Sequence, residues 1–173
     1  MNETLVRAVL AEYVLPWNGI HGLRHWGRVL ENGQRLAERT GADGDVVELF
    51  ALFHDSRRVN EGSDPGHGLR GGDFARTLWE RGLFDLSEEQ FDLLHHACEL
   101  HTAGQVDGDV TVQTCWDADR LDLARVWIIP DPRFLCTEAA KDEGVLSWAI
   151  ERSRSNHQVT AVGTWLEWLS RGP

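Results

Sequence analysis

Apolar side chains recur every three to four residues along nearly the whole chain, and this spacing restricts the fold more than any other feature. In residues 3–15, ETLVRAVLAEYVL, the apolar groups share one helix face. A second helix is predicted over about 21–39, ending before Gly41, because glycine commonly follows a helix C-terminus. Further helices are predicted at 44–55, 69–81, 88–101, from Trp116 onward, at about 138–153 and at about 156–169. We therefore expect an all-α fold.

The length and continuity of the chain indicate one domain. A chain of 173 residues is long enough to bury about 70% of the surface that it exposes when unfolded. It contains no internal repeat, low-complexity segment or convincing linker. We predict a single domain over residues 1–173, a helical bundle whose C-terminal helices occupy about 138–169.

The chain is acidic, with a formal net charge of −11. This charge argues against a nucleic-acid polymer as partner, because clustered lysine and arginine supply the affinity for such a polymer. A small phosphorylated substrate stays compatible with the charge, since a local cation reverses the sign of one pocket. Two bound divalent ions would offset about four of the negative charges.

The sequence carries no sign of a membrane span or a secretion signal. No stretch approaches the roughly 18 consecutive apolar residues of a membrane span. The N-terminus, MNETLVRAVL, lacks a basic segment followed by a long apolar run. Cys98, Cys115 and Cys136 are odd in number and widely spaced, which favours reduced thiols over a disulfide framework. We expect a cytoplasmic protein without a membrane partner.

Histidines and aspartates stand out within this helical pattern. His54 and Asp55 are adjacent at the end of an apolar helix, and His21 and His25 stand four apart on one predicted helix. The His-Asp pair is either a satisfied polar pair of the core or part of a metal site, and the histidine pair is either a solvated helix face or a pair of metal ligands. Imidazole and carboxylate together bind zinc, iron, manganese or nickel. A helical bundle can hold such an ion between the helices of its core.

The order of three short motifs is similar to that of the HD superfamily of metal-dependent phosphohydrolases. The first motif is HWGRV, which begins at His25, the second is the His54-Asp55 pair, and the third is ADRL, which contains Asp119. They appear in this order on predicted helices between about residues 20 and 125. The resemblance implies that His25, His54, Asp55 and Asp119 bind one divalent ion, which is Zn, Mn, Ni, Fe or Mg, between core helices.

The resemblance leaves open whether the site holds one ion or two. HD-GYP phosphodiesterases and HD-domain mixed-valent diiron oxygenases have an extended pattern with two further histidines between the His-Asp pair and the last aspartate. In that pattern the aspartate of the pair bridges two metals. His67 and His101 match the added histidines, and His96 competes with His101. In relatives with one metal, histidines at such places contact the substrate phosphate instead.

The remaining histidines and aspartates have less specific interpretations. His21 is an outer ligand, a proton carrier or a solvated residue. His95 and His157 are interpreted as surface residues. Asp117 and Asp122 are expected to orient ligands or to form caps and salt bridges within their helix.

The resemblance implies hydrolysis of a phosphomonoester or phosphodiester, of a nucleotide or another small phosphorylated compound, by a metal-activated water. The residues expected in catalysis are Asp55, His67, His101, Arg57 and Arg58. The two arginines follow the His-Asp pair directly, and guanidinium groups match phosphate well. Arg125 and Lys141 are weaker phosphate candidates, and Arg28 is expected to pair with an acid beside the site.

Two other functions remain alternatives. The same ligands would serve a diiron oxygenase if both sites held iron, and a protein that only senses a nucleotide would use the pocket without catalysis. The chain lacks the GYP extension, because TAGQVDGDVTVQ follows His101, and it lacks the acidic pair of the alarmone hydrolases, because SRRVNEG follows Asp55. The sequence does not indicate an oligomeric state.

Overall fold

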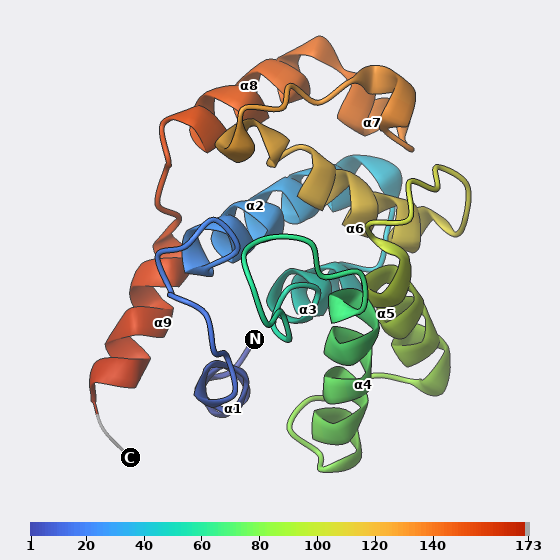
Figure 1. Cartoon of the computed structure of the whole chain (residues 1–173). Coiled ribbons are helices and arrows are strands. Elements are labelled where there is room, and N and C mark those ends of the chain that lie inside the picture. Colours follow the sequence, from blue (N-terminus) through green and yellow to red (C-terminus); the bar gives the residue numbers. More distant parts are fainter. Residues whose placement is uncertain (172–173) are drawn as a thin grey trace.

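The computed structural model describes residues 1–171, and within them every regular element is a helix (Figure 1). The helices, with two short 3₁₀ segments η1 and η2, are α1 (Glu3–Ala11), α2 (Leu23–Thr40), α3 (Gly44–Phe53), α4 (His67–Glu80), α5 (Glu88–Leu100), α6 (Val110–Arg120), η1 (Leu123–Val126), η2 (Pro132–Phe134), α7 (Glu138–Lys141), α8 (Glu143–Arg154) and α9 (Thr160–Ser170). The expected all-α fold is confirmed. No helix within residues 1–171 is both long and apolar enough to cross a membrane.

Three helices form the centre of the bundle. α2 packs against both α3 and α6, while α4 and α5 lie side by side and cover the other flank of α3. Trp26, Phe50 and Trp116, one from each central helix, are fully buried in the main core. A smaller second core around Leu36 and Leu121 joins α2 and α6 to α7 and α8.

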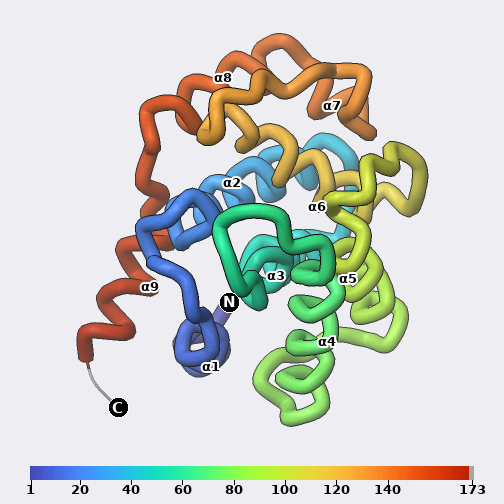
Figure 2. The backbone as a smooth tube through the Cα atoms, viewed as in Figure 1, coloured from blue at the N-terminus to red at the C-terminus, as the bar shows by residue number. Residues whose placement is uncertain are grey.

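The chain returns at its C-terminal end to the helices at its beginning (Figure 2). α9 packs against α1 and α2, and its Val162 and Trp165 are buried in the main core. Gly27 of α2 permits this close packing, because a Cβ atom there would stand 2.5 Å from Val162 Cγ2.

The ends of several helices are set by residues that cap them. Asp43 accepts hydrogen bonds from the backbone of Asp45 and Val46 at the start of α3. Ser87 and Gln90 form a capping box at the start of α5. Gly41 ends α2 in the left-handed conformation, with φ of 76°, as the sequence predicted.

Two expectations about helix position are wrong. His21 and His25 do not share a helix, since α2 begins only at Leu23 and His21 lies in the preceding turn. Pro16, Gly19 and Gly22 account for this turn, because they favour conformations that interrupt a helix. The helix expected from Trp116 already begins at Val110 and so includes the β-branched residues Val110, Thr111 and Val112.

Candidate metal centre

The adjacent His54 and Asp55 follow the last residue of α3, and both are buried. His54 Nδ1 lies 3.1 Å from the Phe50 carbonyl oxygen. Because a carbonyl only accepts, Nδ1 carries the proton and the Nε2 lone pair is free. Burial lowers the pKa of His54 to about 3 and outweighs the opposing effect of nearby carboxylates. His54 is therefore neutral, the state in which imidazole binds a metal.

His25 of α2 and Asp119 of α6 converge on His54. His25 Nε2 lies 3.1 Å from His54 Nε2, 3.4 Å from Asp119 Oδ1 and 3.5 Å from Asp55 Oδ2. Four ligands at about 2.1 Å from one tetrahedral ion stand about 3.4 Å from one another. The distances from His25 match this spacing, and those from His54 Nε2 to Asp55 and Asp119, 3.8 and 4.0 Å, are longer.

Asp122 fixes the orientation of the His25 ring. Its Oδ2 accepts a hydrogen bond of 2.8 Å from His25 Nδ1, and both its oxygens accept from the Arg28 guanidinium, at 2.6 and 3.0 Å. Burial disfavours the Asp122 carboxylate, but the contacts with His25 and Arg28 prevail and lower its pKa to about 2. Asp122 is thus a charged support for the ring of His25, which is the orienting role expected for it.

The facing nitrogens of His25 and His54 fit a bound cation. Each Nδ1 donates to an oxygen, so the two Nε2 atoms, 3.1 Å apart, both present lone pairs to the same point. Two lone pairs at this distance repel each other unless a positive charge lies between them. The donor set therefore suits a divalent ion.

A second group lies on the other side of Asp55. His67, the first residue of α4, and His101, which follows α5, bring their Nε2 atoms within 2.9 Å of each other. His101 Nδ1 donates to the Cys98 carbonyl oxygen at 2.7 Å, and His67 Nδ1 donates to the Asp64 carbonyl oxygen. Both Nε2 atoms thus face inward, as in the first group.

The Asp55 carboxylate lies between the two groups. Its Oδ1 is 3.1 Å from His67 Nε2 and 3.8 Å from His101 Nε2, while Oδ2 faces His25. Oδ2 also lies 2.7 Å from Nδ1 of His21. In the described part of the chain, three groups of side chains have ligand atoms that all lie within 4.8 Å of one another. One is His21, His25 and Asp55; another is His25, His54 and Asp119; the last is Asp55, His67 and His101.

The two arginines after the His-Asp pair point in different directions. Arg58 is buried, with Nη1 3.4 Å from Asp55 Oδ1 and 3.1 Å from His67 Nε2. Arg57 is directed away from the centre, and its Nη1 donates to the backbone and the carboxylate of Glu12. The structure therefore brings only Arg58 to the ligands, and Arg57 serves to attach the turn to the end of α1.

Other residues considered from the sequence also lie away from the centre. His96 is exposed and its ring faces Trp116, so it does not join the second group. Lys141 pairs with Glu138 on the surface. His95 contacts Asp73, and the backbone carbonyl of His157 accepts a hydrogen bond from Arg28. Asp117 accepts hydrogen bonds from the backbone of residues 136 and 137.

Asp64 supports the centre and was not singled out from the sequence. Its carbonyl oxygen holds His67 Nδ1, and its carboxylate binds Arg70 at 2.6 Å and the backbone amide of Val59 at 2.9 Å. A supporting carbonyl oxygen leaves no side-chain signal, since any residue type supplies one. The Gly, Pro and Asp content of the loop indicated only a turn.

The centre opens to solvent at one edge. The side chains of Asp119 and His21 are 15% and 13% exposed, whereas those of His25, His54, Asp55, His67 and His101 are at most 3% exposed. Asp119 and His21 are therefore the members of these groups that solvent reaches.

Comparison with known proteins identifies the type of fold. No protein-family model and no curated protein matches this chain. The chain is similar to the 1.45 Å crystal structure of a predicted HD superfamily hydrolase from an uncultured Thermotogales bacterium. The two are 26% identical, the similarity covers 99% of this chain and 91% of that one, and the TM-score is 0.61. The chain thus has an HD-domain fold, as its motifs predicted, and its His and Asp groups offer ligands for a divalent metal.

Proposed function

We propose that the protein is a metal-dependent phosphohydrolase that acts on small phosphorylated compounds, including nucleotides. The observation that carries this proposal is the convergence of His25 and a neutral His54 with Asp55 and Asp119, whose ligand atoms lie 3.1 to 3.5 Å from His25 Nε2. The similar solved structure, a predicted HD superfamily hydrolase, supports the same class of reaction.

In this proposal His25, His54, Asp55 and Asp119 hold the ion. When bound, a divalent metal lowers the pKa of a coordinated water toward about 7 and polarises a phosphoryl oxygen. Asp122 keeps Nε2 of His25 directed at the ion by accepting from Nδ1.

Arg58, His67 and His101 lie on the far side of Asp55 and serve to bind the phosphate. The guanidinium of Arg58 already stands 3.1 Å from His67 Nε2, so a positive charge occupies the neighbourhood where a second ion would bind. This contact favours one resident ion, with the second group contacting the oxygens of the substrate.

The first test is the metal content of the full chain purified without chelator, beside His54→Ala and Asp55→Ala. We expect about one divalent ion per chain, lost in both variants, and hydrolysis of p-nitrophenyl phosphate that requires the ion. Hydrolysis by chelator-treated protein at the rate of the loaded protein would contradict the mechanism.

A diiron oxygenase is the second candidate, and the position of Asp55 between two histidine pairs favours it. In that case the purified protein contains about two irons per chain and consumes dioxygen. His67→Ala would then remove about half of the metal, whereas in the favoured proposal this variant keeps its ion and loses affinity for phosphate.

A further inference from the structure

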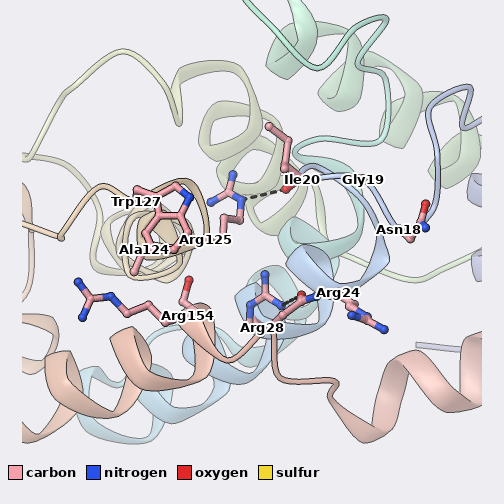
Figure 3. Close-up of a pocket in the computed structure, with 11 residues that line it drawn as sticks. Asn18, Gly19, Ile20, Arg24, Arg28, Ala124, Arg125, Trp127 and Arg154 are labelled. Carbon is pink, nitrogen blue, oxygen red and sulfur yellow. Dashed lines mark hydrogen bonds between the residues drawn. The ribbon is translucent and has the colours of Figure 1, made fainter.

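A cavity of about 220 Å³ lies beside the metal centre and contains none of its ligands. It is bounded by α2, by the turn that precedes α2, by η1 and by the end of α8 (Figure 3). Arg28 and Arg125 lie in the middle of the view, with Arg24 and Asn18 to one side and Arg154 with Trp127 to the other. We call this cavity the arginine pocket.

The arginine pocket is positively charged although the chain is acidic. Its lining includes Arg24, Arg28, Arg125 and Arg154 and no acidic residue. Asp122, just behind the lining, is the acid in contact with these arginines, and Arg28 binds both its oxygens. Only Arg28 and Arg125 lie close to this carboxylate, so the four arginines of the lining leave an excess of positive charge, which favours an anion.

Two of the four arginines have no structural task within residues 1–171. Arg28 is committed to Asp122 and to the segment at 156–157, and Arg125 donates to the carbonyl oxygens of Ile20 and Asp122. Arg24 and Arg154 form no ion pair or hydrogen bond with any side chain in this part of the chain. Their donors are available to a ligand.

Trp127 gives the pocket a flat apolar wall. This residue is 87% exposed, whereas Trp26 and Trp116 are fully buried. Its backbone is in the left-handed region, with φ of 66°, which is unfavourable for a bulky residue. An exposed indole held in this conformation offers a stacking surface for a planar ring.

The arginine pocket adjoins the open edge of the metal centre. Arg125 Nε donates to the carbonyl oxygen of Ile20, the residue before His21, and Arg125 Nη1 lies 3.8 Å from Asp122 Oδ2. Arg125 thus connects the pocket to the turn that carries His21 and to Asp122, which orients His25.

We infer that the arginine pocket binds a second phosphate group of the substrate, while Trp127 stacks on its base. The substrate class is then a nucleotide with at least two phosphate groups, one in the pocket and one at the metal centre. This inference rests on the proposed function for the reaction, but the binding of an anion in the pocket does not require the ion.

The test is the binding of pyrophosphate to chelator-treated full-length protein, measured by calorimetry. We expect binding to the unaltered chain, and each of Arg24→Ala and Arg154→Ala to weaken it by about tenfold, because a hydrogen bond to a charged group is lost. Arg81→Ala is the matched control, because Arg81 is exposed at the end of α4 and its replacement removes the same charge. We expect its affinity to equal that of the unaltered protein.

Absence of pyrophosphate binding, or equal affinities in Arg24→Ala, Arg154→Ala and Arg81→Ala, would overturn the inference. Circular dichroism of each variant verifies that it is folded. With metal restored, a nucleoside diphosphate should bind more tightly than the monophosphate, and Trp127→Ala should weaken the binding of both. Pyrophosphate binding that depends on Arg24 and Arg154, without hydrolysis of any phosphate ester, would contradict the proposed function but would support anion binding in the arginine pocket.

Discussion

Four buried histidines of the centre share one arrangement, in which Nδ1 donates to an oxygen and Nε2 faces inward. The acceptors are a carboxylate, that of Asp122, and three backbone carbonyl oxygens, those of Phe50, Asp64 and Cys98. An acceptor at Nδ1 fixes the tautomer and the ring orientation before any ion arrives. Each ring is thus prepared for coordination by a neighbour that does not itself touch the metal.

Replacing Asp122 with asparagine tests this support at the residue scale. The amide has no charge to match Arg28, so we expect metal affinity to fall by about 10- to 100-fold and stability to fall by about 3 kcal/mol. Competition with a chromogenic chelator measures the first effect and urea unfolding the second. Asp131→Asn is the control, because Asp131 pairs only with the exposed Arg133. Unchanged metal affinity in Asp122→Asn would refute the orienting role.

The reactivity of the three cysteine thiols is also a prediction at the residue scale. Burial and the nearby Asp117 carboxylate raise the pKa of Cys136 to about 12, and burial raises the pKa of Cys98 and Cys115 too. Since the thiolate is the reactive form, we expect slow alkylation of all three by iodoacetamide at pH 8 in the native protein. Rapid alkylation in urea provides the control. Native labelling of Cys136 at the rate seen in urea would contradict this prediction.

At the scale of elements, the glycines of α4 position the second histidine pair. A Cβ atom on Gly68 would stand 2.2 Å from the Cys98 carbonyl oxygen, and one on Gly71 would stand 2.4 Å from that of Phe53. Both of these oxygens belong to the backbone and cannot move away by a change of rotamer, as a side chain could. The bare face of α4 therefore allows it to approach α3 and α5 closely enough for His67 to meet His101.

We expect Gly68→Ala and Gly71→Ala each to destabilise the fold by about 1–3 kcal/mol, because the added methyl group overpacks the contact. Gly163→Ala in α9 is a matched control, since a Cβ there meets no atom within 4 Å. Alanine at that position should be neutral or stabilise the helix by about 0.5–1 kcal/mol. Urea unfolding of the three variants measures the difference, and equal stabilities would show that α4 has room for side chains.

Periodicity predicted the helices better than it predicted the turns that connect them. The order of the motifs in the sequence singled out the four proposed ligands, and their side chains lie close together in the structure. Arg57 and Arg58 lie in the turn after α3, where the helical repeat no longer relates position to direction, so the sequence did not distinguish the inward arginine. His96 and His101 are on one predicted helix, yet only the packing of α5 against α4 determines which of them faces Asp55.

At the scale of the whole molecule, the centre couples metal binding to stability. The four proposed ligands come from α2, from the end of α3 and from α6, so only the folded chain presents them together. A ligand that binds only the folded state stabilises it by about 2.7 kcal/mol at a free concentration 100 times its dissociation constant.

We therefore expect a divalent ion to raise the melting temperature by roughly 5–10 °C over chelator-treated protein. Calorimetry over a series of zinc or manganese concentrations measures the shift. His54→Ala, which removes a ligand, should melt at the same temperature with and without the ion. If no divalent ion changed the melting temperature of the unaltered chain, a metal site built from these helices would be contradicted.

The position of α9 has a consequence for how the chain acquires its final form. This helix seals the face of α2 that bears Gly27, and His25 and Asp122 are 97 positions apart. Closing such long loops is slow compared with forming single helices. Because α2 carries both Gly27 and His25, we expect an ion to bind only after these distant segments have packed onto α2.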